Sequence, residues 1–403
     1  MTCRIKNGCV SPSKEATMPF YEFKEFLKLS SVLNYNLSAT SLNRYNILLF
    51  ILGEKRLDRD DLIDREQKSI VMESLNYLFS VYSQKRRRLG PLAVLHPLRA
   101  AALFARTRDE LNLASLLAAL FHDILEDINP NDFDPQMWKK MEQQLYSLMN
   151  RLSADDEAEL IQRLQYLTRL QGETYYQYIG RLLDNSENAP ELVQIKLADR
   201  LDNTLDMRID LQDPLGEIDF FQAIFQVLFV NNYRGYHPKA EHPPTAVMNG
   251  ARRLYQLFKN AVLLSLIRQM SDISGDSVSQ VLFEALSDAS LLEAQRTLIH
   301  LQGYHFKNLT DQRALLLDAM NYCYSGRTDL VTEPNDKRML DGLFSSYFGQ
   351  PSKKIRNQQL DRLYQNKPLM IETSLAFIVI FLSFLNDNDY YVKGVSAAGI
   401  YPE

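Results

Sequence analysis

The amino-acid sequence predicts an all-α protein. Apolar residues recur at helical spacing in nearly every patterned segment of its 403 residues. The chain has only 15 glycines and 15 prolines, no hairpin signal joins two strand-like segments, and no internal repeat is found. We therefore expect a central helical bundle with additional helical regions on its N-terminal and C-terminal sides.

Residues 1–62 are expected to form an N-terminal tail and helices. The composition of residues 1–18 indicates a mobile tail, and helical spacing follows at 19–33 and 41–53. The next helix is expected at 63–84, where it runs into a basic cluster. The breaker Leu89-Gly90-Pro91 then ends it.

Residues 63–215 are expected to form the central bundle. Two strongly apolar helices are predicted from Pro97 to about Arg106 and from Glu110 to Asp127. The segment Asn129-Pro130-Asn131 stops the second of these. Further helices are predicted near 136–151, 154–170, 173–185 and 189–208.

Residues 216–403 are expected to form a C-terminal helical region, for which we recognise no catalytic motif. Helical spacing at 217–230 is followed by a Gly/Pro/His-rich loop and resumes at 246. The apolar run 375–382 is shorter than the ~20 residues that span a bilayer, so we favour a buried helix over a membrane span. The region could serve as a dimerisation surface, a lid or a sensor, and it is our candidate surface for homo-oligomerisation.

Composition limits the classes of partner. The formal net charge of -5 argues against a dedicated nucleic-acid-binding protein. The three cysteines follow neither a disulfide nor a metal-ligand spacing, which suits a reducing cytosol. The N-terminal residues lack the apolar core of a secretory signal. We therefore expect a cytoplasmic protein with no membrane partner.

The main chemical signal is a set of His and Asp residues inside apolar helical segments: His96, His122, Asp123 and Asp199. Buried charges that lack a partner cost several kcal/mol each, so four such groups need a reason to be there. A divalent cation would supply that reason. Hydrolysis of a phosphate ester is the chemistry that such a cation most naturally supports.

Each of these residues also has an ordinary explanation. His122 and Asp123 could belong to a solvated helix end, but the turns before them are apolar all round. Asp199 could form a buried ion pair, because Lys196 and Asn203 are predicted on its face of the helix. His96 alone would suit a core or capping position, and the following Pro97 suits the first helical position. Taken together, the residues favour a metal site.

Ligand type and spacing suggest which ion is bound and which groups move protons. Two imidazoles and two carboxylates suit Mn, Fe, Zn or Mg. Four protein ligands would saturate tetrahedral Zn but leave an octahedral ion open to water and substrate, which favours Mn²⁺. Glu126 and Asp127 lie one helical turn beyond the His-Asp pair, where they could accept a proton from the attacking water.

Two further groups of residues are candidate binding residues. The basic cluster Lys85 to Arg88 could neutralise substrate phosphates or could be a solvated helix end, and its position shortly before His96 favours the first interpretation. His237 and His242 could form a second metal site with Glu241, but the surrounding prolines and tyrosines favour a structured connector.

At these residues the sequence resembles the HD-domain metal-dependent phosphohydrolases. More narrowly, it is similar to the hydrolase domain of RelA/SpoT-type stringent-response enzymes and their small single-domain relatives. The similarity covers about residues 63 to 210 and rests on Arg87 and Gly90 before His96-Pro97, on the run His122-Asp123-Ile124-Leu125-Glu126-Asp127, and on Lys196-Leu197-Ala198-Asp199-Arg200-Leu201 with Asn203. The family's Pro-Tyr pair before the first ligand histidine is replaced here by Pro91-Leu92, which lacks the aromatic.

The resemblance implies an all-helical fold, a bound Mn²⁺ ion and removal of the 3′-pyrophosphate of guanosine tetra- or pentaphosphate. It implies that the metal ligands are His96, His122, Asp123 and Asp199. Glu126 and Asp127 match the family's catalytic acids. Arg87, Arg88 and Asn203 match residues that contact the nucleotide.

We therefore expect a phosphohydrolase that acts on a nucleotide, with the guanosine alarmone as the leading substrate. Lys196 and the arginines of the basic cluster would stabilise charge on the phosphates. One alternative is an HD hydrolase of another nucleotide or phosphorylated metabolite, which the missing aromatic supports. The other alternative is a nucleotide-binding regulatory protein without turnover, against which the complete ligand set argues.

Overall fold

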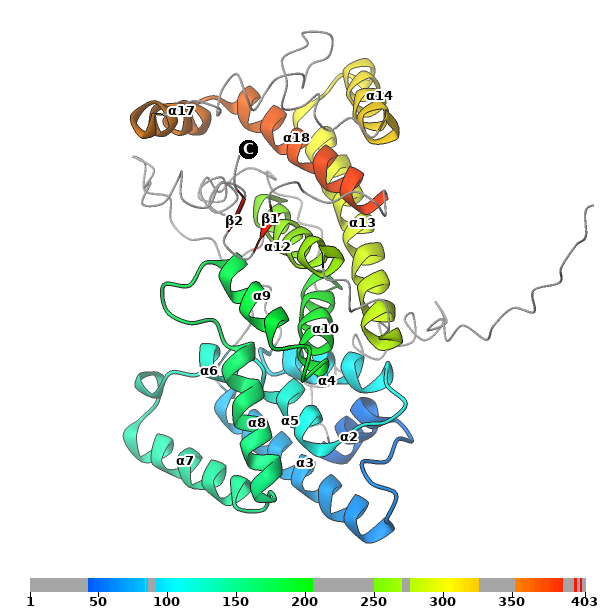
Figure 1. The fold of residues 1–403 in the computed structure, drawn as a ribbon. Coiled ribbons are helices and arrows are strands. Elements are labelled where there is room, and N and C mark those ends of the chain that lie inside the picture. Colours follow the sequence, from blue (N-terminus) through cyan, green and yellow to red (C-terminus); the bar gives the residue numbers. More distant parts are fainter. Residues whose placement is uncertain are drawn as a thin grey trace, which may run out of the picture.

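The computed structural model describes residues 43–83, 85, 92–205, 250–269, 276–325, 352–386 and two short strand segments. Within these residues the fold is all-α, as predicted, apart from one small antiparallel pair (Figure 1). The pair joins β1 (Val395–Ser396) to β2 (Gly399–Ile400), with Val395 opposite Ile400. The helices expected at 19–33 and 217–230 lie outside the described residues.

The described helices between residues 43 and 205 form the lower part of the fold in Figure 1, around buried aliphatic side chains. Side-chain caps fix several of its helix starts. For example, Asp60 accepts the N–H groups of Leu62 and Ile63, and Thr174 forms a capping box with Gln177. The helices and their bounds are α2 (Arg44–Leu52), α3 (Asp61–Val81), α4 (Leu95–Arg106), α5 (Leu113–Phe121), α6 (Ile124–Asp127), α7 (Pro135–Met149), α8 (Ala154–Leu167), α9 (Tyr175–Asp184) and α10 (Glu191–Leu205), with a short 3₁₀ helix at Pro130–Asp132.

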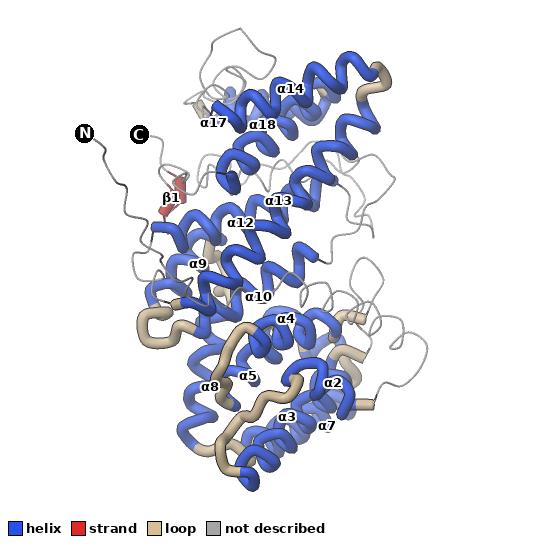
Figure 2. The backbone as a smooth tube through the Cα atoms, turned by 90° about the vertical axis from the view of Figure 1, so that its right-hand side faces the viewer, coloured by secondary structure: helices blue, strands red, loops and turns tan. Residues whose placement is uncertain are grey.

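Of the described helices in the second half, α12 and α13 pack against α10. The long helix α13 contacts α10, α12 and α18, and α12 also contacts α9 and α10. Figure 2 shows α12 and α13 directly above α10, with α14 and α18 farther from the lower part of the fold. The bounds are α12 (Gly250–Gln269), α13 (Ser277–His305), α14 (Leu309–Ser325), α17 (Lys353–Gln365) and α18 (Lys367–Asn386).

The apolar run near the C-terminus belongs to α18, and its side chains are buried, as expected, except for the partly buried Ile380. Phe377, Ile378 and Val379 have no exposed surface. Among the described helices, none is by itself long and apolar enough to cross a membrane. The pair α17 and α18 meets the length and composition test only jointly, across a bend of 105°.

One helix prediction is wrong. The segment from Glu110 to Asp127 does not form a single helix, because α5 ends at Phe121 and the four-residue helix α6 starts at Ile124. The His122 ring donates through Nδ1 to the carbonyl of Ala119 at 2.8 Å. In a continuous helix that carbonyl would accept the N–H of Asp123. The break therefore places the His-Asp pair between two helices.

Candidate metal centre

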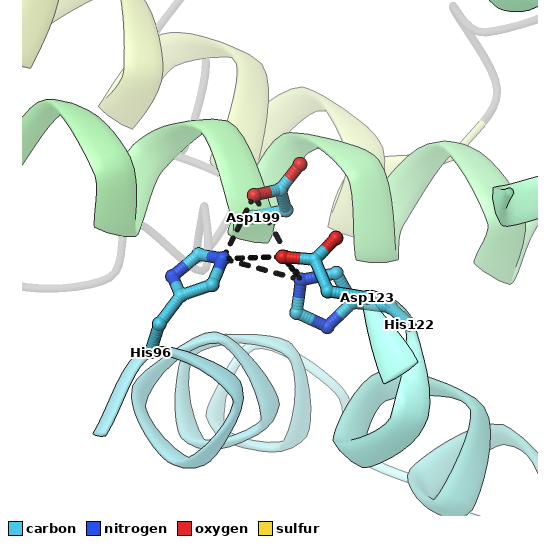
Figure 3. Close-up of side chains that lie close together, drawn as sticks. All are labelled: His96, His122, Asp123 and Asp199. Carbon is cyan, nitrogen blue, oxygen red and sulfur yellow. Dashed lines mark hydrogen bonds and ion pairs between the residues drawn. The ribbon is translucent and has the colours of Figure 1, made fainter. Parts of the chain in front are cut away.

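Four side chains predicted to bind metal meet at one point. His96 comes from the first turn of α4, Asp199 from the middle of α10, and the pair His122-Asp123 from the break between α5 and α6. Each offers one ligand atom, and these four atoms all lie within 4.8 Å of one another. Figure 3 shows the two imidazoles and two carboxylates pointing toward a common centre.

The distances within this cluster suit a shared cation. His96 Nε2 lies 3.1 Å from both Asp123 Oδ2 and Asp199 Oδ1. His122 Nε2 lies 3.2 Å from Asp123 Oδ2 and 3.3 Å from His96 Nε2. Ligand atoms held about 2.1 Å from one ion at right angles are about 3 Å apart, so the set fits an ion at its centre with little rearrangement.

Both histidines are oriented by their second ring nitrogen. His96 Nδ1 lies 2.6 Å from Asp202 Oδ2, and His122 Nδ1 donates to the Ala119 carbonyl. These contacts leave Nε2 of each ring facing the cluster. Such outer partners are typical of metal-ligating histidines, because they fix the ring orientation and raise the basicity of the ligand nitrogen.

Asp202 is a site residue that the sequence reasoning missed. It is buried on α10, three residues beyond Asp199, and it accepts from Arg99 Nε at 2.5 Å as well as contacting His96. Burial acts to raise the pKa of Asp202, but Arg99 and His96 outweigh it and hold that pKa well below its usual range. The i+3 spacing from Asp199 was the available signal, because it puts both carboxylates on one side of the helix.

Asp199 is held by the two neighbours predicted on its helix face. Lys196 Nζ lies 2.7 Å from Asp199 Oδ2, and Asn203 Nδ2 donates to Oδ1 at 2.6 Å. Burial opposes ionisation of Asp199, yet Lys196 and the two histidines hold its pKa well below the ordinary value. In the structure, Lys196 and Asn203 therefore hold the Asp199 carboxylate in the position from which it can bind a metal.

The charge balance of the cluster also fits a cation. Burial acts to lower the pKa of His122, but Asp123 and Asp199 raise that pKa well above its usual value. The two carboxylates thus favour positive charge at the centre of the cluster. A divalent cation would supply that charge, since metal ligands bind as neutral imidazole and ionised carboxylate.

The two acids after the pair lie at the rim of the cluster on α6. Asp127 Oδ2 accepts the hydroxyl of Tyr82 at 2.9 Å, and Glu126 Oε1 accepts the backbone N–H of Arg169 at 2.7 Å. Burial and the charge of Asp123 raise the pKa of Asp127. Tyr82 and the Arg169 backbone were not anticipated from the sequence, because both come from distant segments.

The predicted substrate-binding residues Arg87 and Arg88 lie outside the described residues, and so do His237 and His242 of the expected connector. Lys85 is described, and its ammonium group contacts the backbone carbonyl of Asp127. Within the described part of the chain, no second group of three or more His, Cys, Asp or Glu side chains comes close enough to hold an ion.

Comparison with known proteins identifies the segment that carries this cluster. The family model of the HD domain matches residues 94–204, which run from the start of α4 to the end of α10. That match and the His/Asp cluster fit an HD metal-dependent phosphohydrolase. Neither the curated proteins nor the solved structures contain a significant match to the chain.

Proposed function

We propose that the protein removes a pyrophosphate group from the 3′ position of a guanosine alarmone in a metal-dependent reaction. The observation that carries the hydrolase assignment is the convergence of two imidazoles and two carboxylates within the HD-domain match. Support for the alarmone comes from the sequence: the run from His122 to Asp127 and the run from Lys196 to Leu201 with Asn203 resemble the RelA/SpoT-type hydrolases.

The four ligand side chains would hold a divalent cation, for which we propose Mn²⁺. When bound, such an ion lowers the pKa of water and polarises a phosphoryl oxygen. The residues fit this role because both Nε2 atoms and one oxygen of each carboxylate face the same point. Asp202 and Ala119 keep the rings in that orientation.

We assign proton transfer to the rim acids. The raised pKa of Asp127 makes its carboxylate a better proton acceptor at a given pH than an ordinary aspartate. The Tyr82 hydroxyl fixes Oδ2 of Asp127, so the second carboxylate oxygen is available to a water molecule. Glu126 accepts the Arg169 backbone N–H through Oε1, and its other carboxylate oxygen would orient the water.

Lys196 would stabilise negative charge on the phosphates. Its ammonium group uses one contact on Asp199 Oδ2 and carries three N–H donors, so it can hold the ligand and a phosphate oxygen together. We propose the same role for Arg87 and Arg88, and a nucleotide contact for Asn203, on the strength of the sequence resemblance.

The test of the proposed function is turnover by the purified full chain with Mn²⁺. We expect pyrophosphate release from guanosine tetraphosphate, and we expect Asp123→Ala to lower kcat by at least about a thousandfold, since removal of a ligand removes the ion. The control is Asp288→Ala, on the exposed side of α13. If Asp123→Ala retains turnover at the wild-type rate, the mechanism is wrong.

A second candidate is hydrolysis of a different nucleotide or phosphorylated metabolite. It is favoured by Leu92, which stands where the resembling enzymes have an aromatic residue. A panel of nucleotides and sugar phosphates, read by phosphate and pyrophosphate release, separates the two. Nucleotide binding by the Mn²⁺-loaded protein with no turnover of any compound would instead favour a regulatory protein.

A further inference from the structure

Helix α12 brings a lysine next to the metal centre from outside the HD-domain match. Lys259 is half-buried on α12, which packs against α9 and α10. Its ammonium group lies 5.6 Å from the ring centre of Tyr175 on α9 and 4.8 Å from that of Tyr255 on its own helix. Among the described residues, Lys259 has no ion pair with a carboxylate.

The surroundings of Lys259 carry an excess of positive charge. Burial, followed by the charges of Arg200 and Lys196, lowers the pKa of Lys259 to about 7. The nearby carboxylate that opposes this shift is Asp199, which is already bound to Lys196. A half-buried cation among other cations is costly unless an anion reaches it.

Tyr175 adds a second unsatisfied group to the same place. Its hydroxyl is buried and has no hydrogen-bond partner among the described protein groups. The charges of Arg200, Lys196 and Asp199 act on this hydroxyl, and Lys259 lies over the same ring, so Tyr175 neighbours both the metal centre and Lys259. A buried hydroxyl without a partner costs about 1–3 kcal/mol. The Tyr175 hydroxyl and the Lys259 ammonium group, which has no carboxylate partner among the described residues, therefore point to an anionic acceptor that binds beside both.

The contacts extend this group to the metal centre. Lys196 lies 5.0 Å from the ring centre of Tyr178, whose ring centre is 6.2 Å from that of Tyr175. A chain of contacts therefore runs from Asp199 through Lys196, Tyr178 and Tyr175 to Lys259. A ligand with two linked phosphates could place one at the metal and the other at this end.

We propose that Lys259 and Tyr175 form a phosphate-binding subsite that selects substrates carrying a diphosphate over those carrying a single phosphate. This proposal rests on the proposed function, because it requires one phosphate of the diphosphate to bind at the metal centre. It also gives α12 a role in the site, since this helix would complete a substrate site that the HD segment provides only in part.

The test is binding of methylenediphosphonate, a diphosphate analogue that is not hydrolysed, to the full chain loaded with Mn²⁺. Calorimetry should show that Lys259→Gln weakens this binding about tenfold or more, as expected for loss of one charge-assisted contact. Lys259→Arg should retain most of the affinity. Methylphosphonate binding, which needs only the metal centre, should change less than about twofold.

Two further variants separate a subsite from a structural role. Tyr175→Phe removes only the hydroxyl and should weaken diphosphonate binding several-fold with an unchanged melting temperature. Lys139→Gln, on the exposed face of α7, is the matched control and should bind as the wild type does. The subsite is excluded if Lys259→Gln binds diphosphonate normally, or if it loses methylphosphonate affinity to the same extent.

The outcomes distinguish this subsite from the proposed function. If diphosphonate binding depends on Lys259 while the wild type hydrolyses no phosphate compound, the hydrolase assignment fails and the subsite stands. If the wild type hydrolyses its substrate while Lys259→Gln is indistinguishable from it in binding and KM, the subsite fails and the hydrolase assignment stands.

Discussion

At the scale of single residues, the second nitrogen of each histidine decides whether the cluster can bind an ion. Asp202 contacts His96 Nδ1 and accepts a hydrogen bond from Arg99. These two buried charged residues therefore fix the orientation of one ligand ring. The backbone carbonyl of Ala119 fixes the other ring. The ligand atoms are therefore arranged before a metal arrives.

Asp202→Asn should weaken metal binding by about 10–100-fold, because the amide orients His96 less firmly and does not raise the basicity of its ring. Calorimetric titration with Mn²⁺ measures this directly. Asp288→Asn, a change on the surface of α13, should leave metal affinity unchanged. Equal metal affinity in Asp202→Asn and wild type would mean that Asp202 does not support the ligand.

Tyr82→Phe should shift the pH dependence of catalysis. The Tyr82 hydroxyl donates to Asp127, and this bond favours the ionised carboxylate and so lowers the pKa of Asp127. Without the hydroxyl that pKa rises, and a base that must be ionised works only at higher pH. The acid limb of the kcat/KM profile should therefore move to higher pH. A profile that stays in place would exclude Asp127 as the base.

The candidate ligands could be predicted from sequence because their residue types stand out within apolar segments. Asp199 and the His-Asp pair needed no knowledge of the fold. Asp202 was harder, since an acid near the end of a helix usually faces solvent. Tyr82, Arg169 and Lys259 carry no local signal at all, because only tertiary packing brings them to the site.

At the scale of elements, the break between α5 and α6 is what turns the His-Asp pair toward the other ligands. The apolar spacing continues through this region, so the sequence pattern alone predicts one helix. The break depends on a side-chain bond from His122 to Ala119, which periodicity does not encode. The other described helices between residues 41 and 205 are found close to their predicted bounds.

The Asp64 carboxylate in the first turn of α3 stabilises the fold in a pH-dependent way. Asp64 accepts the Leu57 N–H at 2.8 Å and pairs with Lys68 at 2.8 Å, and these contacts outweigh burial and lower the pKa of Asp64. A carboxyl with a lowered folded-state pKa stabilises the fold above its ordinary pKa, near pH 4, and loses this contribution as pH falls through the lower value.

Asp64→Asn should therefore destabilise the protein by about 1–3 kcal/mol at pH 7, since it weakens a charge-assisted contact. The difference from wild type should shrink as the pH is lowered below about 4. Urea unfolding at several pH values measures both. A difference that is constant across this range would show that ionisation of Asp64 contributes nothing.

At the scale of the whole molecule, a buried polar network joins the HD segment to the second half of the chain. Arg200 on α10 donates to Asn260 Oδ1 and to Gln256, both on α12. Asn260 in turn donates to Thr204 on α10 and Ser290 on α13. Helix α10, which carries Asp199 and Asp202, is thus bonded to α12 and, through Asn260, linked to α13. The sequence could not show this, because residues 250–305 contain no recognisable motif.

Asn260→Ala should cost about 2–4 kcal/mol of unfolding free energy, because it leaves Arg200, Thr204 and Ser290 with unsatisfied buried groups. Denaturant unfolding of the full chain measures the change. Gln280→Ala, on the exposed face of α13, is the control and should stay within about 0.5 kcal/mol of wild type. A cost for Asn260→Ala no larger than the control's would mean that the network does not couple the two halves.

The central claim is that His96, His122, Asp123 and Asp199 bind a single divalent cation. Anomalous diffraction from crystals of the full chain grown with Mn²⁺ tests it most directly. We predict one strong peak per chain within bonding distance of both Nε2 atoms and of one oxygen from each carboxylate. The absence of a peak there, with the four side chains still paired with one another, would contradict the claim.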